Sequence, residues 1–292
     1  MADAQVAFVL YGDYYHPIFV KSLVSQIRSK TALDLDFVCL TDRLDRDLGA
    51  DVRLVVHPGL AHGLDMERLR EGCKFKLGLF HPDVLSPDLP TFFFDLDTMI
   101  TGDIAELLAI YEKNPGIYLL PFHMVQVWKY PWIERTFRKG KYFYGTSSMM
   151  LFKPRDFYGI YEDFQRYYDI VSENRRPLTP GESRAWSTDE QFICWSAQGR
   201  TRGFSLRKFA RFRRGFSAPY WPWLARLKTR LGLNPYRSRA LIGLTFDGAP
   251  FKPSLLANCK PGDLLQERKH FVYWDFPDYQ EHWKALVSAG VG

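Results

Sequence analysis

Along the first 120 residues, short apolar runs that end at polar or turn-forming residues alternate with longer segments of helical spacing. The short runs predict buried strands at 6–11, 36–40, 52–56, 91–94 and 117–120. The segments between them predict helices at 18–27, 66–80 and 104–111. This alternation is typical of a mostly parallel sheet that is covered by helices on both faces. We therefore expect an α/β fold.

The later part of the chain is less regular, and no internal repeat or low-complexity linker divides it. Strands are predicted at 142–152 and 241–246, and helices at 155–171, 187–197 and 279–288. A Pro- and Gly-containing loop is predicted at 175–182. We expect a single domain, 1–292, with a nucleotide-binding half at 1–120, an acceptor or sugar half at 121–260, and a C-terminal segment at 261–292.

Polar residues follow several of the predicted strands and mark a candidate ligand crevice. In an open α/β sheet, ligands bind outside the carboxyl ends of the strands. The first predicted strand leads into Tyr11, Gly12 and Asp13, and the second ends at Thr41 and Asp42. Asp13 and Asp42 could equally be plain turn residues.

The segment Thr-Phe-Phe-Phe at 91–94 ends abruptly at two aspartates, Asp95 and Asp97. Two carboxylates beside a core repel each other and are costly unless a positive charge neutralises them. Mg²⁺ or Mn²⁺ suits this arrangement, because it prefers oxygen ligands and is shared between carboxylates and substrate phosphates. The alternative is an acidic cap of the helix that begins near Asp103, or a solvated turn.

The charge of the chain is unevenly distributed. The formal net charge is +6, but segment 200–240 holds twelve Lys or Arg and no Asp or Glu, so the remainder carries −6. Phenylalanines, tryptophans and leucines lie among these basic residues, a pattern typical of an interfacial helix on anionic lipid. A solvated loop, a protein interface and nucleic-acid binding are alternatives, although no recognised nucleic-acid fold surrounds the segment.

The remaining composition is that of an ordinary globular protein. Four single cysteines form neither a Cys-x-x-Cys pair nor a zinc pattern. We find neither a secretory signal nor an apolar run of about 18 residues, the length of a membrane span. A cytoplasmic protein is therefore expected, with peripheral contact at the inner face of the membrane if segment 200–240 binds lipid.

Five segments in order resemble one family of enzymes. They are KFKLGLF (74–80), FFFDLDTMITGDI (92–104), GTSSMMLF (145–152), TDEQF (188–192) and DGAPFKP (247–253). Together they resemble GT-A fold glycosyltransferases, most of all glycosyltransferase family 8 and its bacterial relatives. The resemblance covers most of 6–252, apart from the basic segment, and its most specific part is the strand followed by Asp-x-Asp.

The resemblance implies a role for each matching residue. Asp95 and Asp97 would hold Mn²⁺ or Mg²⁺ together with Asp247, which stands where the family has a histidine. One extra residue separates Gly248 from Lys252, the expected diphosphate contact. Asp189 and Glu190 would be the catalytic pair beside the sugar. The expected donor-binding residues are Tyr11, Gly12, Asp13, Asp42, Lys74, Lys76, Asp95, Thr146, Ser147, Gly248 and Lys252.

The expected activity is transfer of a sugar from a nucleotide-sugar donor, with UDP-sugars favoured, to a glycan or lipid-linked acceptor. Retention of the anomeric configuration is implied by the resemblance, although Glu190 replaces a frequent amide and could act as a base or nucleophile. No nucleic-acid partner is expected. The alternatives are a non-catalytic sugar-nucleotide or membrane-binding module and a haloacid-dehalogenase-type phosphatase. Met99 stands where that phosphatase motif has Thr or Val.

Overall fold

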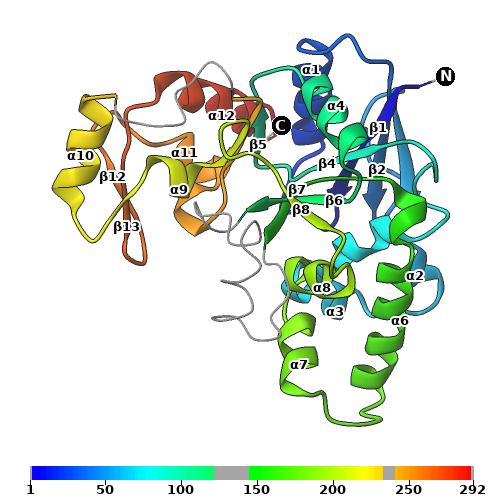
Figure 1. Ribbon diagram of the computed structural model, residues 1–292. Coiled ribbons are helices and arrows are strands. Elements are labelled where there is room, and N and C mark those ends of the chain that lie inside the picture. The colour runs from blue at the N-terminus through cyan, green and yellow to red at the C-terminus, as the bar shows by residue number, and fades with distance from the viewer. Residues whose placement is uncertain (1, 122–144, 233–240, 291–292) are drawn as a thin grey trace. The chain divides into compact units, whose positions relative to one another are not determined.

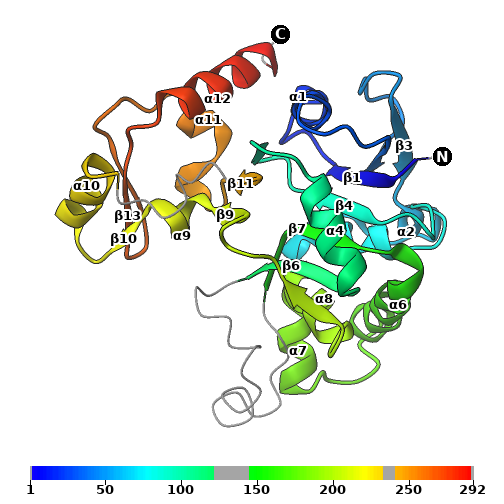
Figure 2. The same ribbon diagram turned by 45° about the horizontal axis from the view of Figure 1, so that its top comes forward.

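The computed structural model describes residues 2–121, 145–232 and 241–290, and these residues form two compact units (Figures 1 and 2). The first unit comprises Met1–Gly12, Leu33–Phe94 and Ala105–Phe204. The second comprises Asp13–Ala32, Asp95–Ile104 and Ser205–Gly292. The two units interleave along the chain. The expected division at 1–120, 121–260 and 261–292 stays a prediction. Each unit is described by itself.

The first unit is built on a seven-stranded sheet with the order β3-β2-β1-β4-β7-β6-β8. Its strands are β1 (Ala4–Leu10), β2 (Leu35–Thr41), β3 (Val52–Val56), β4 (Thr91–Phe94), β6 (Ile117–Pro121), β7 (Gly145–Phe152) and β8 (Thr201–Gly203). Strand β7 is antiparallel to both of its neighbours, and the other pairs are parallel. Figure 2 shows β1, β4, β7 and β6 side by side. The mostly parallel sheet is thus confirmed.

Helices cover this sheet and complete an aromatic core. They are α2 (Pro58–Ala61), α3 (Met66–Arg70), α4 (Ala105–Lys113), α6 (Gly159–Ser172), α7 (Pro180–Trp186) and α8 (Asp189–Ser196), with 3₁₀ segments η1 (Glu71–Phe80) and η3 (Pro154–Phe157). Segment η1 contacts β1, β2, α6 and α8. Its apolar side chains are fully buried, because they lie inside the main core cluster of the unit.

The helix predicted at 66–80 is wrong in its second half. Helix α3 ends at Arg70, and the chain continues as the 3₁₀ segment η1, in which Gly72 and Cys73 have φ angles of +61° and +59°. A Cβ at Gly72 would lie 2.3 Å from the carbonyl oxygen of Ser187, so this close backbone approach requires glycine. The break matters for the site, because Lys74 and Lys76 are buried rather than on a solvated helix face.

The loop predicted at 175–182 is also partly wrong, because helix α7 begins at Pro180. Proline suits the first turn of a helix, where its missing N–H is not needed. Thr179 caps the helix, and its side chain and that of Glu182 form a reciprocal capping box. The helix predicted at 155–171 begins instead as η3 and continues as α6. Residues 142–144 of a predicted strand lie outside the described residues.

The second unit combines two small sheets with short helices. Its sheets have the orders β5-β11-β9 and β10-β13-β12. The strands are β5 (Thr98–Ile100), β9 (Phe209–Arg211), β10 (Ala218–Pro219), β11 (Gly243–Thr245), β12 (Leu264–Glu267) and β13 (His270–Tyr273). The helical segments are α1 (Ile18–Arg28), α9 (Phe212–Phe216), α10 (Pro222–Arg230), η4 (Ala249–Phe251), α11 (Pro253–Leu256) and α12 (Pro277–Gly290).

Much of the basic segment belongs to the core of this second unit. The ring of Phe212 packs against Phe246, Trp274 and Phe276, with centroids 4.8 to 5.7 Å apart. The sequence pattern alone favoured a surface insertion, but its phenylalanines are anchors of a local core. Residues 233–240 of the segment lie outside the described residues. Across 2–121, 145–232 and 241–290, no helix combines the length and the apolar character needed to cross a membrane.

Candidate active site

The acidic turn after β4 carries a buried ion pair in the second unit. Asp97 is 4% exposed, and its Oδ2 lies 2.5 Å from Nζ of Lys252. The hydroxyl of Tyr15 also donates to Oδ2 of Asp97, at 3.3 Å, and Nζ of Lys252 lies 3.4 Å from that hydroxyl. The predicted metal ligand Asp97 and the predicted phosphate contact Lys252 are therefore neighbours.

Burial and charge act in opposite directions on this pair. Burial raises the pKa of the Asp97 carboxyl, and it outweighs the attraction of the Lys252 ammonium. Burial alone would lower the pKa of Lys252, but Asp97 outweighs it and raises that pKa. The pKa of Tyr15 is raised by burial and then by the negative charge of Asp97. Lys252 therefore places a positive charge beside a carboxylate whose ionised form burial disfavours.

Strand pairing explains why Lys252 reaches Asp97 from 155 residues further along the chain. Strand β5 begins one residue after Asp97 and pairs antiparallel with β11, with Thr98 opposite Thr245. The N–H of Phe246 then donates to the carbonyl oxygen of Asp97 at 2.8 Å. Asp247, Gly248 and Lys252 follow β11 directly, so the ladder brings the late motif to the acidic turn.

Asp247 is held by arginines of the basic segment. Arg211 and Arg213 both contact its Oδ2, the latter at 3.3 Å, and Nη1 of Arg213 lies 2.7 Å from Oε2 of Glu267. Gly248, with φ of +107°, permits this arrangement, because a Cβ there would lie 2.3 Å from Oε2 of Glu267. No local pattern signals these arginine contacts, because their partners lie more than 30 residues away along the chain.

The donor set suits a divalent cation held by two carboxylates and substrate phosphates rather than by an all-protein cage. Asp95 and Asp97 are close enough for the charge of Asp95 to raise the pKa of Asp97. Within the described part of the chain, no group of three His, Cys, Asp or Glu could hold a metal ion. Oδ1 of Asp247 is buried and makes no hydrogen bond to the described residues. Ligation by Asp247 therefore stays a prediction.

Replacing Asp247 by Asn is expected to lower the free energy of unfolding by about 3 kcal/mol, because two largely buried arginines lose a shared carboxylate. Urea denaturation measures this. Asp263→Asn is the matched control, since Asp263 is exposed. If both substitutions lower the free energy of unfolding by the same small amount, the arginines do not depend on Asp247 for their charge balance.

Three predicted site residues meet in the first unit at the junction of η1, β7 and α8. Lys76 and Asp189 are 7% and 5% exposed, and Nζ of Lys76 lies 3.2 Å from Oδ2 of Asp189. The hydroxyl of Ser147 donates to the same oxygen at 2.6 Å and accepts from Nζ of Lys76 at 3.1 Å. The Lys76 ammonium also lies 4.9 Å from the centre of the Phe93 ring. The Asp189 carboxylate is thus fixed in orientation.

Other predicted residues lie around this group. Lys74 donates to the carbonyl oxygen of Glu71 at 2.9 Å and lies 5.0 Å above the Trp186 ring, and burial lowers its pKa. The hydroxyl of Thr146 bonds that of Ser148 at 2.9 Å. Glu190 is half-buried in the first turn of α8, next to Asp189. Acids are favoured at this helix end, so its position alone does not assign a role.

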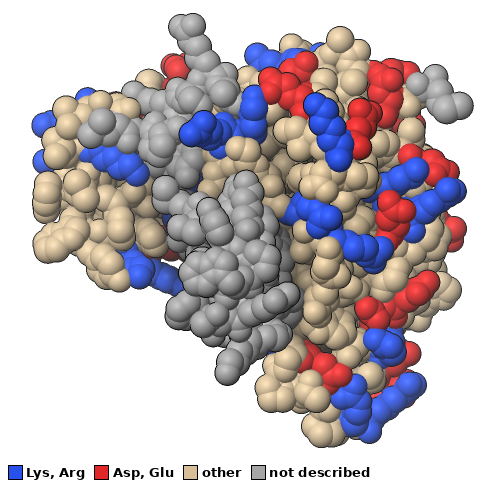
Figure 3. Space-filling view, viewed as in Figure 1, with Lys and Arg blue, Asp and Glu red and all other residues tan. Residues whose placement is uncertain are grey.

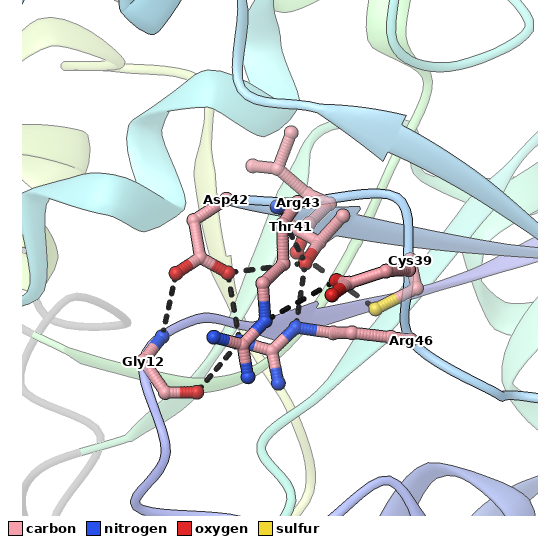
Figure 4. A network of polar contacts seen from close by, with 8 residues as sticks. Gly12, Cys39, Thr41, Asp42, Arg43 and Arg46 are labelled. Atoms are coloured by element: carbon pink, nitrogen blue, oxygen red, sulfur yellow. Dashed lines mark hydrogen bonds and ion pairs between the residues drawn. The ribbon is translucent and has the colours of Figure 1, made fainter.

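A second polar network fixes the turn after β1, as Figure 4 shows. The N–H of Gly12 donates to Oδ2 of Asp42 at 3.0 Å. Arg46 donates from Nη2 to Oδ1 of Asp42 at 2.7 Å and to the carbonyl oxygen of Gly12 at 2.6 Å. Its Nε donates to the hydroxyl of Thr41 at 3.0 Å. Both oxygens of Asp42 are therefore used to hold the turn, and Arg46 was not foreseen.

Tyr11 and Asp13 flank Gly12 in the sequence. The Tyr11 ring stacks on Phe75 at 4.6 Å in the first unit. Asp13 begins a segment of the second unit and is exposed. Nucleotide contacts by either residue stay predictions.

The Asp42–Arg46 pair gives an expected pH dependence. Burial alone would raise the pKa of Asp42, but the hydrogen bonds from Arg46 and Gly12 outweigh it and hold that pKa below 3.8. The stability from this pair is therefore present above pH 3.8 and lost as pH falls through the lower folded-state pKa. Asp42→Asn should cost about 1–3 kcal/mol at neutral pH. Urea denaturation at several pH values should show that this difference shrinks below pH 3.8; a constant difference would contradict it.

No protein-family model and no curated relative matches this sequence. Solved structures do match. An active-site mutant of LgtC has 10% identity and a TM-score of 0.55 over 98% of this chain and 95% of its own. The galactosyltransferase LgtC in complex with donor and acceptor sugar analogues has 9% identity and a TM-score of 0.54, over 99% and 96%.

A third match is the bifunctional glycosyltransferase WbbM, with 12% identity and a TM-score of 0.55 over 100% of this chain and 52% of its own. Identities this low carry information about the fold and not about the substrates. The seven-stranded, mostly parallel sheet and these matches together confirm the predicted architecture. The chain has the GT-A fold of glycosyltransferases.

Proposed function

We propose that this chain is a metal-dependent glycosyltransferase that moves a sugar from a nucleotide-sugar donor to a glycan or lipid-linked acceptor. The observation that carries the proposal is the buried Asp97–Lys252 pair, which lies at the acidic turn directly after β4. The neighbours of the same fold are glycosyltransferases, and one was crystallised with donor and acceptor sugar analogues. This favours a transferase over the phosphatase alternative.

Asp95 and Asp97 would hold Mn²⁺ or Mg²⁺ together with the donor diphosphate. Such a cation, when bound, would offset the negative charge that develops on the departing nucleoside diphosphate. Lys252 adds a second positive charge near the same turn, and this charge matters most in the transition state. The Lys252 ammonium is already positioned before the donor binds, because it donates hydrogen bonds to Asp97 and Tyr15.

In the first unit, the Lys76–Ser147–Asp189 group supplies a fixed carboxylate for the sugar. The sugar develops positive oxocarbenium character as the glycosidic bond to the donor breaks. Ser147 and Lys76 hold Oδ2 of Asp189, and the carboxylate held in this way would stabilise that positive character. Glu190 is the neighbouring carboxylate. We propose retention of configuration and a UDP-sugar donor, both on the resemblance of the sequence motifs.

A non-catalytic sugar-nucleotide module is the second candidate, and one observation favours it. The position of the third metal ligand is an aspartate that two arginines hold. Such a chain could bind a sugar nucleotide and lack turnover.

Release of nucleoside diphosphate separates the two candidates. The protein is incubated with a panel of nucleotide sugars, with Mn²⁺ or Mg²⁺ and with mixed glycan and lipid extracts as acceptors. The proposal predicts release from one donor class. Folded protein that binds a sugar nucleotide by calorimetry but releases nothing from any donor would contradict the transferase and support the binding module.

The proposal also includes contact between segment 200–240 and an anionic membrane surface at the inner face.

A further inference from the structure

The basic segment 200–240 separates into a buried and an exposed set of cations in the second unit. Arg211 and Arg213 form ion pairs with Asp247 and Glu267 inside the unit. Nζ of Lys228 donates to the carbonyl oxygen of Ser217 at 3.0 Å and is partly buried. These three residues therefore are not part of a freely exposed positive surface, although they belong to the twelve Lys and Arg counted in the sequence of 200–240.

Helix α10 and its two end residues carry most of the large apolar side chains that remain exposed in this segment. Trp221 and Trp223 are 57% and 61% exposed, and Leu227 and Leu231 are 42% and 58% exposed. Ala225 and Thr229, four residues apart, are buried and fix which side of the helix faces the unit. Trp223 and Leu227 are each two residues from Ala225. Two residues correspond to about 200° around the helix, so both side chains lie on the opposite side.

Cations flank this apolar set. Arg226 and Arg230 are exposed on α10, and the Arg226 guanidinium lies 5.2 Å from the centre of the Tyr273 ring. The turn between β12 and β13 adds Lys269, whose ammonium lies 4.8 Å above the Tyr220 ring and donates to its hydroxyl at 2.7 Å. Figure 3 shows blue side chains among tan atoms at the left, where Figure 1 labels α10. We call Trp221, Trp223, Leu227, Leu231, Arg226 and Arg230 the α10 face.

We propose that the α10 face docks on an anionic lipid surface. Tryptophan is favoured at the boundary between headgroups and acyl chains, where its ring is apolar and its N–H remains hydrated. Arginine close to acidic headgroups adds attraction that depends on salt. The charge of the segment is complementary to such a surface, because 200–240 contains no Asp or Glu that would repel it.

This inference narrows the proposed membrane contact to one helix face and holds whether or not the chain turns over a sugar nucleotide. Vesicle binding and nucleoside diphosphate release are measured separately, so either can fail alone. A second copy of this chain is the other occupant that the exposed tryptophans could have, and the experiment distinguishes it.

The test is flotation of the full chain with vesicles of phosphatidylcholine alone or with added phosphatidylglycerol. The proposal predicts binding to the anionic vesicles at low salt and loss of binding at high salt. The variant Trp221→Ala/Trp223→Ala should bind at least about tenfold more weakly. Arg226→Gln/Arg230→Gln should lose about fivefold per residue and become less sensitive to salt.

Leu44→Ala/Ile110→Ala is the matched control, since both side chains are exposed and lie outside the α10 face. It should bind vesicles as the parent protein does. The proposal is overturned if neutral and anionic vesicles bind equally, or if the tryptophan variant binds like the control. It is also overturned if the parent protein does not bind vesicles but forms a dimer, and the tryptophan variant does not form that dimer.

Discussion

Asp97→Asn is expected to lower the rate of nucleoside diphosphate release by about 10³-fold. The substitution removes the buried carboxylate that neighbours Lys252 and would hold the metal. It keeps the size of the side chain, so packing against the acidic turn is preserved. Asn cannot balance the Lys252 ammonium, and we expect the free energy of unfolding to fall by about 1–3 kcal/mol as well. Release assays at saturating donor and urea denaturation measure the two effects.

The matched control is Asp278→Asn, because Asp278 is an exposed acid in the first turn of α12. It should retain release and lose only a few tenths of a kcal/mol. Asp97→Asn protein that is folded and releases nucleoside diphosphate at the parent rate would show that the acidic turn has no part in the reaction.

Lys76→Met is expected to lower the free energy of unfolding by about 3–5 kcal/mol, because it leaves the buried Asp189 carboxylate without its cation. Methionine preserves most of the apolar stem, so lost packing is a minor part of the effect. Ser147 still donates one hydrogen bond to Asp189, but a hydroxyl does not replace a full charge. Urea denaturation followed by tryptophan fluorescence measures the loss.

A double variant separates the ion pair from other effects of Lys76. Lys76→Met/Asp189→Asn removes both charges, and it should be more stable than the sum of the two single changes predicts by about 1–3 kcal/mol. Lys113→Met, at an exposed position near the end of α4, should be nearly neutral. Additive losses in the double variant, or a Lys76→Met loss as small as that of Lys113→Met, would contradict a buried ion pair.

The strands of the first unit were predictable because each is a short apolar run with its own stop signal. The predicted strands at 52–56 and 91–94 match β3 and β4 residue for residue. The predicted helices failed where backbone contacts from distant residues decide the conformation. Gly72 lies against the backbone of Ser187, and no local pattern signals that approach.

The site was predictable where a motif carried it. Asp97 and Lys252 were named as partners of one diphosphate, and Lys76, Ser147 and Asp189 as donor and sugar residues; the structure brings each set together within its own unit. The roles of these residues stay predictions. Tyr15, Arg46, Arg211 and Arg213 were not foreseen. Arg46 sits in an ordinary polar loop, and the other three act through residues more than 30 positions away.

Calorimetric binding of UDP to the full chain, with Mn²⁺ or with EDTA, is the most direct test of the proposed metal–diphosphate site. We expect binding that needs the metal, with affinity at least about tenfold lower in EDTA and in both Asp97→Asn and Lys252→Met. UDP binding of equal affinity with Mn²⁺, with EDTA and in both variants would contradict a metal–diphosphate site at the acidic turn.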